Sequence, residues 1–273
     1  MTRSVVVAVL ACLLTACGGD AAHPSLGTRF ARAVGLADAP PPPTITIDIL
    51  CDPSKDSTCT TESLDATITS TLPAIADRPG SELRLFMLGS DLASTRLIAT
   101  VRNTTSASGN ANTAKMSRGR FVDASRSAVM TAAQPYLAAS PKGGSPIAEA
   151  LTTVAMSTVH TDSRVLCVVS DAREVSVVGG DFECDDPLPT PPSFAKALQR
   201  HRVLPPGSLA GVKVFFTYFA IAPMHRHGCV ETLERLAQMK DLWTAAVEAA
   251  GGTPQFDSGG IDSTAITTKK GDN

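Results

Sequence analysis

The sequence feature that most constrains the fold is the run from Arg164 to Asp171, which reads Arg-Val-Leu-Cys-Val-Val-Ser-Asp. Its centre is five apolar residues in a row, mostly β-branched, with a charge before them and two polar residues after them. Such a run predicts a strand that is buried on both faces, as in a parallel sheet covered by helices. Ligands of these sheets bind beyond the carboxyl ends of the central strands. Ser170 and Asp171 are therefore expected at a ligand-binding edge.

A second strand is expected to end in the same way. Residues Thr44 to Cys51 alternate and end apolar, with high β propensity, and they lead into Asp52-Pro53-Ser54-Lys55-Asp56. Just before the central strand, residues 143–151 read Gly-Gly-Ser-Pro-Ile-Ala-Glu-Ala-Leu. This is the pattern of a glycine turn, a capping Ser145, a proline at the first helical position and an apolar helix. Two oxygen-rich loops and one helix start are thus predicted to accompany the central sheet.

The order of the remaining segments predicts an α/β fold: one doubly wound, mostly parallel sheet with helices on both faces, spanning residues 44–258. Residues 103–115 are expected to form a loop. Residues 172–206 are acidic and rich in Pro and Gly, and are expected to be a long recognition loop with a short helix at 194–201. The other expected helices cover residues 60–75, 121–137 and 230–250, and the other expected strands cover 82–88, 95–102, 211–221 and 253–257.

Composition argues against nucleic-acid binding, and the motifs argue against the alternative of a metal-assisted phosphoesterase at the ligand-binding edge of the sheet. The chain has 273 residues, 43% of them hydrophobic, and a net charge of −2 with both signs spread along it. This length and hydrophobic content are enough to form a buried core. The charge pattern lacks the basic stripe that binding to DNA or RNA requires. The sequence also has no Gly-x-Ser-x-Gly elbow and no glycine-rich phosphate loop with a lysine, so we expect no catalysis.

The N-terminus has the layout of a secretory leader. Arg3 is followed by a short apolar run, from Val5 to Leu14, and by Leu14-Thr15-Ala16-Cys17-Gly18. This segment resembles the lipobox of bacterial lipoproteins, which implies that residues 1–17 contain the leader and that Cys17 becomes the lipidated first residue. By the same resemblance, Gly18 in place of Asp favours an anchor in the outer membrane, facing the periplasm or the cell surface. The alternative is an ordinary leader with an incidental cysteine.

Both ends of the expected domain are flanked by polar segments. Residues 18–43 lack an apolar period and end in four prolines, which predicts a stiff tether that holds the domain away from a bilayer. Residues 259–273 are polar and are expected to form a flexible tail.

Export places the remaining cysteines in an oxidising compartment. Five remain after the leader and the lipidated residue are excluded, so one thiol is expected to stay free, and Cys167 inside the central strand is the candidate. We expect disulfides between Cys51 and Cys59, which bracket the Asp52 loop, and between Cys184 and Cys229. A zinc site is the alternative, although no tight Cys-x-x-Cys pair supports it; its ligands would be Cys184, His225, His227 and Cys229.

Taken in order, the two oxygen-rich loops and the Gly-Gly-Ser-Pro helix start resemble the von Willebrand factor A domain. That family builds a metal-ion-dependent adhesion site from an Asp-x-Ser-x-Ser loop after the first strand, a Thr before a middle helix and an Asp after the fourth strand. The resemblance covers most of residues 44–257. It implies a site for Mg²⁺ or another divalent cation, which prefers oxygen ligands and leaves one position for a partner's carboxylate. The implied ligands are Asp52, Ser54, Asp56, Ser145 and Asp171.

The sequence departs from that pattern in three places. Asp56 stands where the family has its second Ser, Ser145 replaces Thr, and Ala172 replaces the Gly that often follows the last Asp. A third carboxylate would make the cation less attractive to an acidic partner, so metal binding would survive while metal-bridged adhesion weakens. Alternatively, Lys55 fills the space of the cation.

Each implied ligand also has a purely structural interpretation. Ser145 fits a helix N-cap, Asp52 fits an Asx-type turn and Asp171 fits a cap of the turn that follows it. The preferred interpretation is a lipid-anchored, extracytoplasmic A-type domain that binds another protein in the cell envelope, with a divalent cation at a degenerate adhesion site at the top of the sheet. The alternative is a metal-free structural component of an envelope assembly, in which residues 172–206 make the contacts.

Overall fold

The structure is a computed structural model. It describes residues 42–54, 57–89, 94–105, 111–139, 144–182, 187–219, 225–226, 229–230, 232–259, 261 and 266. The leader, Cys17 and the tether up to residue 41 lie outside the described residues. From Pro43 onward the chain forms one compact unit. None of the described helices combines the length and apolar character that crossing a bilayer requires.

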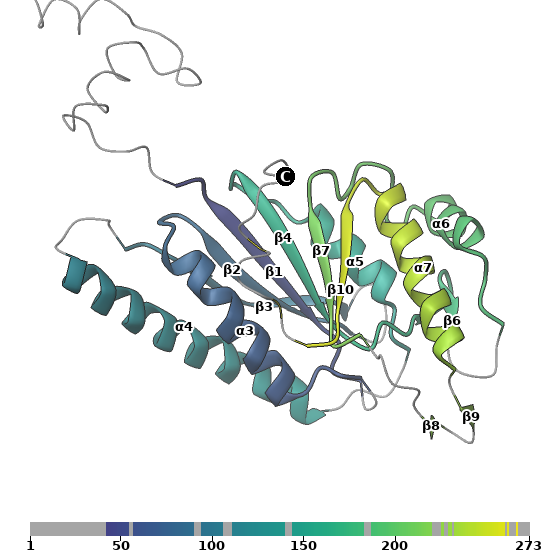
Figure 1. The fold of residues 1–273 in the computed structure, drawn as a ribbon, viewed down its shortest axis with the longest axis horizontal. Coiled ribbons are helices and arrows are strands. Elements are labelled where there is room, and N and C mark those ends of the chain that lie inside the picture. The colour runs from purple at the N-terminus through teal and green to yellow at the C-terminus, as the bar shows by residue number, and fades with distance from the viewer. Residues whose placement is uncertain are drawn as a thin grey trace, which may run out of the picture. The chain divides into compact units, whose positions relative to one another are not determined.

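The unit is built on a six-stranded sheet, which confirms the doubly wound α/β prediction (Figure 1). The strand order is β10-β7-β4-β1-β2-β3, and only the edge strand β3 runs antiparallel to its neighbour. The two strands with the strongest apolar runs, β1 and β4, lie next to each other in the middle. The strands are β1 (Ile45–Cys51), β2 (Glu82–Met87), β3 (Arg96–Arg102), β4 (Ser163–Val169), β7 (Lys213–Thr217) and β10 (Thr253–Asp257).

Helices cover both faces of this sheet (Figure 1). Alternate residues of a strand point to opposite faces, so β1 contributes Ile47 and Ile49 to the core under α3 and α4 and Leu50 to the core under α5 and α7. α6 packs on α7. The helices are α3 (Thr61–Ala76), α4 (Ala111–Ala139), α5 (Ile147–Met156), α6 (Pro191–Arg200) and α7 (Leu233–Ala249).

Three segments differ from the sequence-based expectation. α4 begins at Ala111, inside the expected 103–115 loop. The sequence pattern did not indicate this start, because the first turns of the helix are exposed and polar and show no apolar period. Residues 172–206 are mostly ordered structure: a hairpin of β5 (Val175–Ser176) and β6 (Gly180–Asp181), then α6. A second short hairpin joins β8 (His225–Arg226) and β9 (Cys229–Val230). Of the tail that was expected to be loose, Ile261 and Ile266 are buried in the core under α3 and α4.

A buried ionic network at the sheet's centre was not anticipated from the sequence. Asp48 of β1 is fully buried and accepts from the Nε atoms of Arg84 and Arg164, both at 2.6 Å. Arg164 also donates to the carbonyls of Val154 and Ala155, at the end of α5. One carboxylate therefore ties β1, β2 and β4 to the C-terminus of α5.

Candidate functional site

The two oxygen-rich loops meet at the carboxyl edge of the sheet, as predicted. β1 and β4 are parallel and in register from Ile45 and Ser163 to Cys51 and Val169, so Asp52 and Ser170 leave the sheet at the same level. The amide of Asp52 donates to the carbonyl of Val169 at 3.1 Å. We call the edge formed by Asp52, Ser54, Ser145, Ser170 and Asp171 the rim.

Hydrogen bonds join the three segments of the rim. The Ser170 hydroxyl donates to Asp52 Oδ2 at 3.1 Å, and the Ser54 amide donates to Asp52 Oδ1 at 3.1 Å. The Ser145 hydroxyl donates to the Ser54 hydroxyl at 3.3 Å. Three predicted site residues, from two distant parts of the sequence, are therefore in direct or one-step contact. The Ser54 bond is also the Asx-type turn that was the structural interpretation of Asp52.

Asp171 is paired with a cation from the protein itself. The Arg173 guanidinium and amide donate to the two oxygens of its carboxylate, the amide at 3.2 Å, and both side chains are about 5% exposed or less. The pKa of Asp171 is raised to about 6, chiefly because the carboxyl is buried; the Arg173 charge and hydrogen bonds oppose this rise, and the nearby Asp52 adds to it. Desolvation of a carboxylate favours its neutral form, and here it outweighs the ion pair.

The backbone at Ala172, between Asp171 and Arg173, is strained and is anchored to the core. Ala172 has a φ of 62°, a left-handed conformation that favours glycine. Its amide donates to the Ser170 hydroxyl, and its carbonyl accepts from the Trp243 indole at 2.8 Å. Trp243 of α7 is fully buried, so this bond fixes the Asp171 loop to the core.

Ser145 is not the N-cap that its sequence setting predicted. The cap position is Pro146, which makes no side-chain capping bond, and α5 begins at Ile147. The free Ala148 amide is instead capped by Glu174 Oε2 at 2.9 Å. Because Glu174 caps the helix from another segment, the Ser145 hydroxyl faces Ser54.

The cysteine predictions fare differently. Cys51 and Cys59 form a disulfide that closes the Asp52 loop, and Cys167 is a buried free thiol. Both findings confirm the prediction. Cys184 and His227 lie outside the described residues, as do Lys55 and Asp56. The second disulfide, the zinc alternative and the Asp56 ligand therefore stay predictions.

The rim suits a divalent cation only in part. Asp52, Ser54 and Ser145 supply adjacent oxygens, but both oxygens of Asp171 already accept hydrogen bonds from Arg173. Within the described ranges, no group of three or more His, Cys, Asp or Glu side chains could hold a metal. Arg173 therefore already compensates the negative charge of Asp171 that a metal ion would use.

Comparison with known proteins does not assign this chain to a family. No protein-family model matches the sequence. No curated protein matches it either. Among solved structures, similar chains include the pilus adhesin SpaC from Lactobacillus rhamnosus GG, with 11% identity, 82% of this chain and 30% of that chain covered, and a TM-score of 0.46.

Two further structures are similar at the same low level. The PilB minor pilin from Streptococcus sanguinis has 8% identity over 81% of this chain and 58% of its own, with a TM-score of 0.44. A von Willebrand factor type A protein from Catenulispora acidiphila has 13% identity over 78% and 38%, with a TM-score of 0.34. This chain spans less than two thirds of the length of each of these three proteins. At such low identities and TM-scores, no function is transferred from them.

Two functional candidates were missed by the sequence analysis, namely Arg173 and Glu174. Both directly follow Ala172, where a buried strand has just ended, and both are buried. The signal in the sequence was a pair of opposite charges at a predicted ligand edge. Nothing in the pattern indicated that these side chains turn inward.

Proposed function

We propose that the chain is a lipid-anchored, extracytoplasmic module that binds another protein through the rim, and that Arg173 supplies the positive charge there in place of a divalent cation. The observation that supports this most is the buried pair of Asp171 and Arg173. A guanidinium that pairs with this carboxylate neutralises the charge that would otherwise attract a metal ion. The module is not proposed to catalyse a reaction.

A second candidate is binding through Mg²⁺. The contacts among Asp52, Ser54 and Ser145 favour it, because they gather three neutral or anionic oxygens at one point. It requires Arg173 to leave Asp171, which would free a carboxylate for the ion.

A manganese titration separates the two candidates. The full-length chain in detergent is titrated with Mn²⁺, and free Mn²⁺ is followed by electron paramagnetic resonance. We expect no binding by the wild type and measurable binding by Arg173→Gln, with Asp52→Ala added to that variant abolishing it. Wild-type binding that is lost in Asp52→Ala would contradict the first candidate and support the second.

A photo-crosslinker tests the protein-binding part of the proposal. A photo-crosslinking amino acid replaces Ser54, which is half-buried at the rim. In the control variant, the same amino acid replaces Glu248, which is exposed on α7. In the source bacterium treated with chelator, we expect a discrete protein adduct from position 54 and none from position 248. The absence of an adduct at position 54, or its dependence on added cation, would contradict the proposal.

A further inference from the structure

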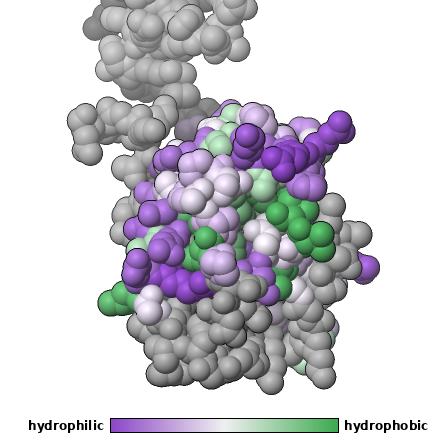
Figure 2. Space-filling model, turned by 90° about the vertical axis from the view of Figure 1, so that its right-hand side faces the viewer, coloured by the Kyte–Doolittle hydropathy of each residue, from purple (hydrophilic) through white to green (hydrophobic). Residues whose placement is uncertain are grey.

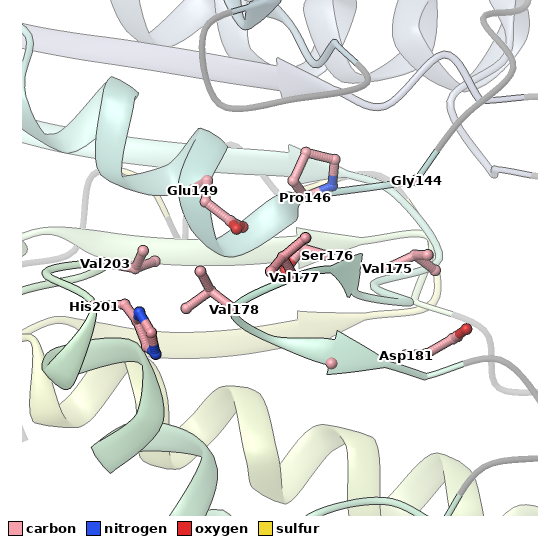
Figure 3. Close-up of a pocket in the computed structure, with 11 residues that line it drawn as sticks. Gly144, Pro146, Glu149, Val175, Ser176, Val177, Val178, Asp181, His201 and Val203 are labelled. Atoms are coloured by element: carbon pink, nitrogen blue, oxygen red, sulfur yellow. The ribbon is translucent and has the colours of Figure 1, made fainter.

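A second concave site lies beside the rim, between α5 and the β5–β6 hairpin (Figure 3). Its volume is about 680 Å³, and we call it the acidic pocket. Glu149 and Asp181 are its carboxylate residues, and His201 is the one described lining residue with a side chain that can become positively charged. Apolar lining comes from Pro146, Val175, Val177, Val178 and Val203.

One oxygen of a buried carboxylate lacks a hydrogen-bond partner at this pocket. Glu149 is 6% exposed, and its Oε2 atom has no hydrogen-bond partner among the described residues. Figure 3 shows its carboxylate pointing from α5 toward the hairpin. An unpartnered, desolvated carboxylate oxygen is unfavourable, and a donor that reaches it from the pocket would remove that cost.

A second carboxylate lies behind the first. Glu174 is fully buried, and its Oε1 atom also lacks a hydrogen-bond partner among the described residues. Burial, and then the neighbouring Glu149 carboxyl, raise the pKa of Glu174 well above its ordinary value. Both effects favour the neutral form of Glu174, so a cationic head group that enters the pocket would pair with Glu149.

The walls indicate which cation fits. Valine side chains surround the carboxylate, and Val177 at the hairpin turn is fully exposed to solvent. Lysine and arginine combine an apolar stem, which packs on such walls, with a head that donates several hydrogen bonds. Figure 2 shows hydrophobic and hydrophilic surface side by side on the face on the side of α6 and α7.

From this geometry we infer that the acidic pocket receives a lysine or arginine side chain of the partner protein, whose head group pairs with Glu149 and whose stem lies along Val175, Val178 and Val203. The inference rests on the proposed function as a protein-binding module. It names the chemistry of the partner, which must present a basic side chain next to the segment that contacts the rim.

The test uses small probes that differ only in their charge. The full-length chain in detergent, at about pH 8, which is above the ordinary pKa of a carboxyl group, is titrated calorimetrically with Nα-acetyl-lysine amide and Nα-acetyl-arginine amide. Nα-acetyl-norleucine amide has a similar stem and no charge. We expect at least one basic probe to bind about tenfold more tightly than the norleucine probe, since a charge-assisted hydrogen bond is lost without the head group.

Matched glutamate variants locate the binding site. Glu149→Gln keeps the shape of the side chain and is expected to weaken the basic probe about tenfold. Glu248→Gln, on the exposed side of α7, should not weaken it. Unchanged binding in Glu149→Gln, with circular dichroism showing a folded chain, overturns the inference, as does equal binding of the norleucine probe.

Two competitors test other ligands. Spermidine that binds more tightly than either basic probe would assign the pocket to a free polyamine, and Ca²⁺ that displaces the probe from the wild type but does not bind Glu149→Gln would assign it to a metal ion. Either result overturns the inference. Failure here leaves the Mn²⁺ and crosslinking results at the rim unchanged, so it is distinguishable from failure of the proposed function.

Discussion

Among single residues, Asp171 decides the charge of the rim. It is buried beside Arg173, and its pKa is raised to about 6 from an ordinary value of 3.8. A carboxyl with a raised pKa in the folded state binds its proton more tightly there than in the unfolded chain. Its contribution to stability is therefore complete below the unfolded pKa and is lost as the pH rises through about 6.

The raised pKa of Asp171 predicts how stability changes with pH. The free energy of unfolding of the wild type, minus that of Asp171→Asn, should increase as the pH falls from 7 to 4, by a total on the order of 3 kcal/mol. Urea unfolding at several pH values measures it. The matched control is Asp65→Asn, because Arg126 lowers the pKa of Asp65 and the corresponding difference should decrease over the same range. A flat or decreasing difference for Asp171 would contradict the assignment.

Trp243 is the residue that fixes the Asp171 loop to the core. Its indole donates to the Ala172 carbonyl, and its ring packs against Phe182, Phe194 and Phe216. Trp243→Phe should lower the free energy of unfolding by about 2–4 kcal/mol, through a cavity and a lost hydrogen bond. Leu233→Ala, exposed on the same helix, should cost less than about 0.5 kcal/mol. Equal losses in the two variants by urea unfolding would be evidence against the anchor.

Sequence reasoning located the rim's oxygen residues and missed its cation. Asp52, Ser54 and Asp171 follow strands with strong patterns, and Ser145 precedes a helix with a strong pattern, so topology alone places them together. The orientation of Arg173 depends on the left-handed turn at Ala172, and the capping of α5 depends on Glu174 reaching across from another segment. Neither contact leaves a local pattern in the sequence.

Among the helices and strands, the buried network around Asp48 is the strongest polar link. Its carboxylate is shared by Arg84 of β2 and Arg164 of β4, and Arg164 closes the end of α5. Asp48→Asn leaves two arginines buried with less compensation, so we expect a loss of about 3–5 kcal/mol in the free energy of unfolding.

The control for this prediction is an exposed pair. Asp77 and Arg118 join α3 to α4 at the surface, where both side chains are about half exposed. Asp77→Asn should cost no more than about 1 kcal/mol. If thermal or urea unfolding gives Asp48→Asn the same small cost, the network does not hold the strands together.

The sheet could be predicted from the sequence more fully than the helices. Buried parallel strands such as β4 have continuous apolar runs, which the sequence shows directly. The bounds of the edge strand β10 also match the predicted range. The first turns of α4 are polar on all sides, and the hairpin of β5 and β6 is too short to show alternation. These elements are determined by the packing of the whole unit.

For the molecule as a whole, the proposed role depends on an anchor at Cys17. Cys17→Ser should abolish incorporation of labelled palmitate and release the chain from the membrane fraction of the source bacterium. Cys12→Ser, within the expected leader, should retain the label. Continued labelling of Cys17→Ser would contradict the lipoprotein prediction and leave an exported domain without this anchor.

For the whole molecule, the order of the segments with clear strand and helix patterns predicted the fold class. It did not predict the function. A doubly wound sheet supports many unrelated activities, so the role must come from the site itself. Besides the departures at Asp56, Ser145 and Ala172, the site holds a buried Arg173, and we propose that its ion pair with Asp171 takes the place of a metal ion.

A double-mutant cycle on Asp171 and Arg173 measures that ion pair. The free energies of unfolding of the wild type, Asp171→Asn, Arg173→Gln and the double variant are compared by urea unfolding at about pH 8, where Asp171 is ionised. We predict a coupling energy of about 2–3 kcal/mol, as expected for a buried charge pair. A coupling below about 0.5 kcal/mol would mean that the two residues act independently and that Arg173 does not take the place of a cation at the rim.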